Sequence, residues 1–312
     1  MIELVNVTKE YNGIRAVDNI SFKINDKEFV VIIGTSGCGK TTTLKMINKL
    51  IKPTSGEIYI NGEDTSEIDP IKLRRSIGYV IQEIGLMPHM SVEKNIALVP
   101  QLKGWPSKKR KKRAEELIEF MNLDPDKCRH KKPSQLSGGQ RQRVGVARAL
   151  AADPDIILMD EPFGALDPLT KTQLQHEFTN LLREVEKTVV FVTHDMQEAV
   201  MFADKIVIMN KGKIVQVDTP QEIFKNPAND FVRDFFNMDD VYNKLKAIKV
   251  EAAAIDYSLE EELDSEVRID DHLSDAIAIM LKDGVTELHV KNTKDSKNLK
   301  VTFDSINKTV RR

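Results

Sequence analysis

The sequence predicts an α/β protein in which a main domain, built on a parallel sheet covered by helices, precedes a small second α/β unit. Short apolar segments at 29–33, 155–159 and 188–192 alternate with helical stretches, an order typical of a parallel sheet. Residues 1–29 instead alternate apolar and polar side chains, which predicts antiparallel strands. Near residues 236–241 the pattern becomes charged and weakly periodic, so we place a domain boundary there.

The composition is that of an ordinary soluble globular chain, because 41% of the 312 residues are hydrophobic and 30% are charged. A net charge of −2 argues against a broad nucleic-acid-binding surface, so no nucleic-acid partner is expected. Two cysteines, Cys38 and Cys128, fit the pattern of reduced thiols in a cytosolic protein. The apolar runs are too short to span a bilayer, and the N-terminus lacks the pattern of a signal peptide. We therefore expect other chains to supply any membrane channel.

The N-terminal strands predict an antiparallel β subdomain with turns at 12–13 and 25–26. A helix is expected over 40–50, directly after a glycine-rich loop. Residues 92–122 are charged and helix-rich, which predicts a helical subdomain. Within it, the basic run 108–113 could bind anionic lipid or nucleic acid, but a solvated helix face is favoured because aromatic residues are not interleaved with it.

A phosphate-binding loop is predicted between the strand 29–33 and the following helix, because the residues there fit G-x-x-x-x-G-K-[ST]. Its members are Gly34, Thr35, Ser36, Gly37, Cys38, Gly39, Lys40 and Thr41. Backbone N–H groups of such a loop surround a triphosphate, and the helix dipole adds positive potential. Lys40 would bridge the terminal phosphates, Thr41 would ligate Mg²⁺, and Thr42 completes the nucleotide-binding set. A plain strand-to-helix turn would require neither the lysine nor the hydroxyl, so ATP and Mg²⁺ are the expected cofactors.

Two carboxylates follow the apolar strand 155–159. Asp160 is expected to hold the Mg²⁺ shell, and Glu161, one residue further, to polarise the attacking water. A strand that ends in Asp-Glu is on its own more typical of a surface turn. The preceding phosphate loop in the same chain favours the catalytic interpretation.

A second helix start suited to an anion is predicted at 136–140, Leu-Ser-Gly-Gly-Gln, before a helix over 141–151. Ser137 is an N-cap residue, and Gly138 and Gly139 let the backbone approach a ligand closely. With Gln140, this segment resembles the signature sequence of ABC ATPases. The resemblance covers residues 1–238 and implies a P-loop NTPase core of the ABC ATPase type.

In that family two nucleotide-binding domains pack head to tail, so the resemblance implies a homodimer. Each ATP lies between the phosphate loop of one subunit and the signature helix of the other. Four further residues match positions of that family. Tyr11 matches the aromatic ring that stacks on adenine, and Gln82 matches a glutamine that touches Mg²⁺ and senses the membrane subunit. Asp167 matches the loop that crosses the dimer, and His194 matches the switch histidine at the γ-phosphate. In isolation, Tyr11 would be interpreted as packing and His194 as the neighbour of a helix cap.

Residues 78–90 resemble ATPase subunits of importers for glycine betaine, carnitine, choline or proline betaine. This implies transmembrane permease subunits, a separate or permease-fused substrate-binding protein, and a place at the cytoplasmic face of the membrane. An aromatic cage for a quaternary amine would lie in another subunit, because the chain has one tryptophan, Trp105. The alternatives are an importer of another small solute such as an amino acid, a soluble ABC ATPase acting on ribosomes or DNA, and a catalytically inactive regulatory subunit.

The tail is expected to comprise a linker over 239–265 and a single or partial CBS-like module over 266–312. The module resembles the CBS family in its helix–turn–strand order, with a strand expected at 287–290. One helical face collects the apolar residues Leu273, Ala276, Ile277, Met280 and Leu281. CBS modules work in pairs, and no second module follows Asn307. The tail could therefore bind a regulatory nucleotide with its copy across the dimer, or act as a passive dimerisation module.

Overall fold

The computed structural model describes residues 1–82, 85–164, 171, 175, 186–236, 245, 248–256, 266–283, 285–291 and 299–310. The chain divides into two compact units, Met1–Ile223 and Phe224–Arg312. Among the residues that the structure describes, no helix has both the length and the apolar character needed to cross a membrane.

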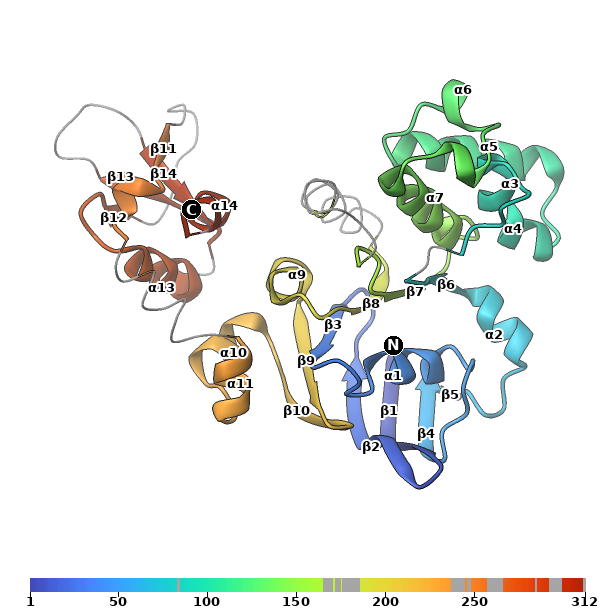
Figure 1. Ribbon diagram of the computed structural model, residues 1–312, viewed down its shortest axis with the longest axis horizontal. Coiled ribbons are helices and arrows are strands. Elements are labelled where there is room, and N and C mark those ends of the chain that lie inside the picture. The colour runs from blue at the N-terminus through green and yellow to red at the C-terminus, as the bar shows by residue number, and fades with distance from the viewer. Residues whose placement is uncertain are drawn as a thin grey trace. The chain divides into compact units, whose positions relative to one another are not determined.

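A six-stranded sheet forms the centre of the first unit, in the order β10-β9-β3-β8-β7-β6 (Figure 1). Its strands are β3 (Phe29–Gly34), β6 (Ile77–Val80), β7 (Ile156–Asp160), β8 (Thr188–Val192), β9 (Lys205–Asn210) and β10 (Lys213–Asp218). All neighbours pair in parallel except β10, which pairs antiparallel with β9. The three predicted apolar segments are confirmed as β3, β7 and β8, and every residue of these strands is buried.

The predicted antiparallel subdomain is confirmed as a second sheet in the order β2-β1-β4-β5. Its strands are β1 (Ile2–Tyr11), β2 (Ile14–Ile24), β4 (Ser55–Ile60) and β5 (Glu63–Asp64). The turn between β1 and β2 uses Asn12 at φ 49° and Gly13 at φ 81°, a left-handed pair that asparagine and glycine tolerate. Helix α1 (Lys40–Ile47) contributes Leu44, Met46 and Ile47 to one hydrophobic core that joins both sheets.

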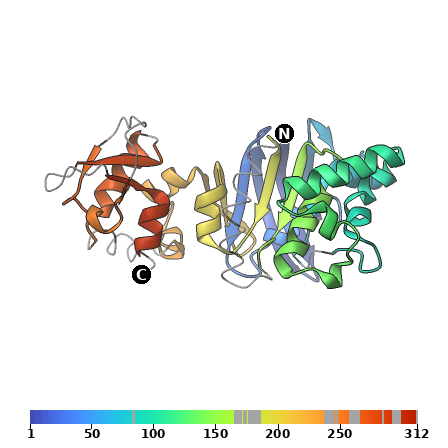
Figure 2. The same ribbon diagram turned by 90° about the horizontal axis from the view of Figure 1, so that it is seen from above.

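A helical subdomain lies beside the β6 edge, and both views show its helices grouped together (Figures 1 and 2). It comprises α3 (Val92–Ile96), α4 (Leu98–Leu102), α5 (Ser107–Phe120), α6 (Pro125–Cys128) and α7 (Gly138–Leu150). Helix α5 buries Ala114, Leu117 and Ile118, while most of the basic run before them faces solvent. Trp105 precedes α5 and is half-buried, with the Lys109 ammonium 3.9 Å from its ring centroid.

The first unit also contains two short helices, α2 (Pro70–Ser76) and α9 (Met196–Phe202). A third, α10 (Pro220–Lys225), includes the last residue of this unit, Ile223. Helix α9 is capped by Asp195, and Thr193 and His194 form the short turn between the end of β8 and this cap. Four aromatic rings form one cluster, because the Phe191 centroid lies 6.0 Å from those of Phe29 and Phe163 and 5.4 Å from that of Phe202. This cluster packs α9 against β3 and β8.

The second unit contains a four-stranded mixed sheet in the order β11-β14-β13-β12. Its elements are α11 (Asp230–Phe235), β11 (Ile255–Asp256), β12 (Glu266–Arg268), α13 (Leu273–Asp283), β13 (Glu287–Lys291), β14 (Leu299–Thr302) and α14 (Phe303–Val310). The expected helix and strand are confirmed as α13 and β13, and Leu273, Ala276 and Met280 are buried in the core of this unit. The expected linker over 239–265 lies mostly outside the described residues.

Candidate functional site

The phosphate loop joins β3 to α1, and two of its glycines lie where a side chain has no room. A Cβ at Gly34 would come within 2.0 Å of the Met209 carbonyl oxygen on β9. Gly39 has φ 106°, and its Cβ would come within 2.4 Å of the Ala16 carbonyl oxygen on β2. Glycine is therefore required at both positions, because the loop threads between the two sheets.

Lys40 is buried, with 5% of its surface exposed, and its ammonium lies inside the loop. Its Nζ donates to the carbonyl oxygens of Gly34 at 2.8 Å and Thr35 at 3.1 Å, and a lysine has three such donors. The N-cap Gly39 offers no side chain to the first turn of α1, whose N–H groups have no intrahelical acceptors. The loop thus presents an ammonium and several N–H donors, a donor set that fits phosphate oxygens.

The remaining loop residues line its rim and floor. Thr35, Ser36 and Gly37 are exposed, and Thr42 is half-buried on α1. Cys38 is buried, and burial raises the pKa of its thiol. The thiol is therefore a neutral group that packs inside the loop. Cys38 would contribute to nucleotide binding through its backbone N–H.

Thr41 and Asp160 meet across the end of the sheet, where the Thr41 hydroxyl donates to Asp160 Oδ1 at 2.8 Å. Asp160 ends β7 and is 4% exposed, and burial raises the pKa of its carboxyl. A buried carboxylate beside a hydroxyl is a hard-oxygen pair of the kind that Mg²⁺ uses together with phosphate oxygens. The residues present therefore fit Mg²⁺, and bound cation would offset the cost of burying the charge.

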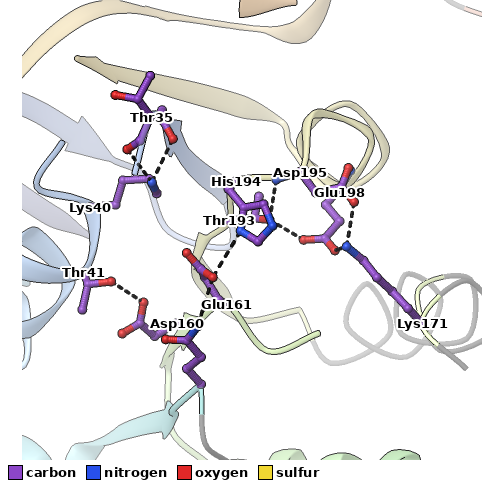
Figure 3. Close-up of polar contacts among 12 residues, drawn as sticks. Thr35, Lys40, Thr41, Asp160, Glu161, Lys171, Thr193, His194, Asp195 and Glu198 are labelled. Carbon is purple, nitrogen blue, oxygen red and sulfur yellow. Dashed lines mark hydrogen bonds and ion pairs between the residues drawn. The ribbon is translucent and has the colours of Figure 1, made fainter. Parts of the chain in front are cut away.

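Glu161 lies between Gln82 and His194, as Figure 3 shows for the glutamate and the histidine. Its Oε2 is 3.2 Å from Gln82 Nε2, which donates to it, and 3.2 Å from His194 Nδ1. Glu161 has a left-handed backbone at φ 43°, and its N–H donates to the Val192 carbonyl at 2.9 Å. This conformation is uncommon for a residue other than glycine and occurs at strained functional sites.

Around the turn that carries His194, Asp195 and two residues that the sequence did not point to, Lys171 and Glu198, form a polar network. Asp195 Oδ2 accepts from Lys171 Nζ at 2.7 Å, and the same ammonium lies 2.9 Å from Glu198 Oε1. Thr193 donates to Glu198 Oε2 at 2.5 Å. Part of the signal was available, because Asp195 followed three residues later by Glu198 is the pattern of a helix start.

The other predicted binding residues lie apart from this cluster. Tyr11 ends β1 with 45% of its surface exposed, and the Lys9 ammonium lies 4.9 Å from its ring centroid. Ser137 caps α7, accepting from the Gln140 N–H at 3.2 Å, and Gln140 Oε1 accepts from the Ser137 N–H at 3.1 Å. This capping box explains why α7 begins at Gly138 instead of at 141 as expected. Asp167 lies outside the described residues.

Comparison with known proteins adds independent evidence. A family model described as "ABC transporter" matches residues 17–164. The glycine betaine uptake system ATP-binding protein YehX of Escherichia coli is 45% identical over 294 residues, which cover 94% of each chain. The carnitine transport ATP-binding protein OpuCA of Listeria monocytogenes is 58% identical over 240 residues, which cover 77% of this chain and 60% of that protein. The chain thus spans about 60% of the length of the carnitine transport proteins it matches.

A solved structure gives the same result for the fold. The dimeric ATP-binding cassette MJ0796, in a post-hydrolysis state bound to ADP and phosphate, is 40% identical with a TM-score of 0.63, and the match covers 70% of this chain and 98% of that one. Sequence identity along nearly the whole length of one relative, the family match and the shared fold lead to one conclusion. The chain belongs to the ABC transporter family.

Proposed function

We propose that this chain is the ATP-binding and ATP-hydrolysing subunit of an ABC importer for a quaternary ammonium osmoprotectant such as glycine betaine, carnitine or choline. The observation that supports hydrolysis best is the position of Glu161. Its carboxylate is contacted by Gln82 and His194 and follows directly after Asp160 in the chain. A base beside a candidate metal carboxylate and a phosphate loop is the arrangement that phosphoryl transfer to water requires.

Each residue has a role in this proposal. Lys40 and the N–H groups of the loop would hold the β- and γ-phosphates, while Thr41 and Asp160 would hold Mg²⁺ together with Gln82. When bound, Mg²⁺ neutralises charge on the phosphate oxygens. Glu161 accepts the proton of the water that attacks the γ-phosphorus, and the bond to the ADP oxygen breaks. His194 donates a hydrogen bond toward the γ-phosphate and keeps Glu161 oriented.

The complete site is proposed to need two copies of the chain. Ser137 is exposed at the start of α7, where the helix dipole and free N–H groups suit an anion. We propose that this helix start faces the phosphate loop of the partner, with Gly138, Gly139 and Gln140 beside the γ-phosphate and Asp167 crossing the interface. Tyr11 would stack on adenine. The related cassette MJ0796 is dimeric, which supports this assembly.

The transported substrate is proposed from the relatives. OpuCA is named for carnitine transport and YehX for glycine betaine uptake. Transmembrane permease subunits and a separate or permease-fused binding protein would supply the pathway and the aromatic cage for the ammonium group. The chain would then work at the cytoplasmic face of the membrane, where ATP is available.

The tail is proposed to be a single CBS-like module that pairs with its copy across the dimer. The order of α13 and β13 and the separate core of the second unit support this assignment. Pairing would create a cleft for a regulatory nucleotide.

Phosphate release from Mg²⁺-ATP by the purified full-length chain tests the hydrolytic proposal, with Lys40→Ala as the control that should release none. Uptake of radiolabelled glycine betaine by proteoliposomes that hold the chain and its co-purified permease tests the substrate. Hydrolysis without uptake of any betaine, carnitine or choline would leave the ATPase assignment and overturn the substrate.

A further inference from the structure

A buried carboxylate lies directly below the turn that carries His194. Glu198 on α9 is 2% exposed, and its two oxygens accept three hydrogen bonds. Thr193 Oγ1 donates to Oε2 at 2.5 Å, while Gln175 Nε2 and Lys171 Nζ reach Oε1 at 2.8 and 2.9 Å. A carboxylate that is buried this deeply is stable only with such partners. Loss of one partner would leave the charge uncompensated, and this free-energy cost keeps the hydrogen bonds in place.

Lys171 extends the network to the other side of the turn. Its Nζ donates to Asp195 Oδ2 at 2.7 Å, and Asp195 Oδ1 caps α9 by accepting from the Gln197 N–H at 2.8 Å. Burial opposes the charge of Lys171, but hydrogen bonds to Asp195 and Glu198 outweigh it and raise its pKa. Burial likewise opposes ionisation of Asp195, yet Lys171 lowers its pKa. Both groups are therefore ionised at neutral pH.

The two residues fixed by this network flank His194 on either side (Figure 3). Thr193 is held through its hydroxyl, which also accepts from the Asp195 N–H at 2.9 Å, and through its own N–H, which donates to the Ile32 carbonyl at 3.2 Å. By contrast, the His194 side chain is 59% exposed. With little packing around the imidazole, the backbone on each side sets where it lies, and hence its 3.2 Å approach to Glu161.

We infer that Lys171 and Glu198 are positioning residues for His194: their ion pair holds the turn 193–195 so that the imidazole reaches Glu161 and the γ-phosphate. The inference rests on the role proposed above for His194. Lys171 and Glu198 touch neither substrate nor metal in this account. A displacement of the imidazole by about 1 Å would cost on the order of 10- to 100-fold in rate.

A double-mutant cycle in the full-length chain tests the inference. Lys171→Met and Glu198→Gln should each lower kcat for ATP hydrolysis by about 10- to 100-fold, with the KM for ATP within about twofold because the phosphate loop is untouched. Lys171→Arg, which keeps the charge, should retain most of the rate. In a His194→Ala background, adding Lys171→Met should lower kcat no further, because the residue through which it acts is gone. Full additivity of the two losses would overturn the inference.

The matched control is Lys205→Met, which breaks the ion pair between Lys205 and Glu28 at 2.5 Å. Lys205 is 25% exposed and Lys171 is 22% exposed, so the control also removes a partly buried ammonium from an ion pair, but one that does not involve the turn 193–195. Only Lys171→Met should lose kcat, and equal losses in both would overturn the inference. If Lys171→Met does not fold, the double-mutant cycle with His194→Ala is measured with Glu198→Gln instead. A wild-type kcat for His194→Ala alone would instead refute the proposed role of His194, an outcome distinct from additivity.

Discussion

The Nδ1 atom of His194 lies 3.2 Å from Oε2 of Glu161, although the two residues are 33 positions apart and extend from the ends of neighbouring strands. This contact orients the carboxylate that we propose as the base. Glu161→Gln keeps the shape and the contact but removes the basic oxygen. We expect ATP binding to be retained and phosphate release to fall by about 10²–10⁴-fold. Single-turnover phosphate release measures the loss.

The slow Glu161→Gln variant should accumulate as an ATP-bound dimer that elutes earlier from a sizing column than the nucleotide-free chain. Wild-type turnover in this variant would show that another group takes the proton from water.

The composite nature of the site can be tested at Ser137, which is 97 positions from Lys40 in sequence. Ser137→Arg should abolish hydrolysis by placing a large side chain where the partner's γ-phosphate would lie. In the proposed arrangement each site takes its loop from one chain and its helix start from the other, so a heterodimer of Ser137→Arg with Lys40→Ala would contain one intact site. Residual hydrolysis by the mixed pair, when each variant alone is inactive, would demonstrate that arrangement. A monomeric, fully active Ser137→Arg variant would contradict it.

We expect the Asp160 side chain to lower the free energy of unfolding when Mg²⁺ is absent. Burial raises the pKa of its carboxyl, and a carboxyl with a raised folded pKa stabilises the fold below its unfolded pKa and loses this contribution as the pH rises through the folded value. Asp160→Asn keeps an oxygen that can accept from Thr41 and carries no charge. We expect the melting temperature of the nucleotide-free chain at pH 7 to rise by about 1–4 °C.

This gain for Asp160→Asn should vanish below about pH 4, where the wild-type carboxyl is protonated. The variant should also gain less stability from Mg²⁺-ATP than the wild type, because one proposed metal ligand is lost. Calorimetry with and without nucleotide checks both statements, and a gain independent of pH would point to packing instead of charge.

Truncation after residue 238 should leave an active ATPase, because the first unit contains the phosphate loop, both carboxylates and His194, and it has a hydrophobic core of its own. The cut keeps the packing of Phe224 against Phe236, whose ring centroids are 5.4 Å apart. We expect the regulation of transport to change, and the rate of ATP hydrolysis to stay the same. Transport by the truncated chain should respond less to ionic strength or to a small nucleotide, since coupling of this kind is typically worth about 1–3 kcal/mol. Identical titration curves for both lengths would mark the tail as a passive module.

Much of the site could be predicted because its residues occur in short local patterns. The proposed phosphate loop lies in eight adjacent residues, Gly34 to Thr41, and Asp160 and Glu161 come directly after the apolar residues 156–159. The predicted ends of the helices were less accurate. The helix expected over 40–50 ends at Ile47, because Lys49 adopts a left-handed backbone at φ 48° that stops it.

What could not be predicted depends on contacts between distant segments. The hydrogen bond from Gln82 to Glu161 joins residues 79 positions apart, and the one from Lys171 to Asp195 joins an otherwise unremarked lysine to a helix cap. Neither pair forms a pattern that can be found along the chain. The strands β9 and β10 were also missed, and with them the position of β3 in the middle of the sheet.

That position has a consequence for synthesis on the ribosome. Strand β3 pairs with β8 on one edge and β9 on the other, and β9 ends at Asn210. The strand that carries the phosphate loop therefore emerges about 10–35 s before its last partner, at roughly 5–20 residues per second. Until β8 has been made, both edges of this entirely apolar strand are open to pairing with another nascent chain. Ribosome-bound chains arrested before residue 186 should consequently bind chaperones that recognise extended apolar segments, and should release them once β9 has been made.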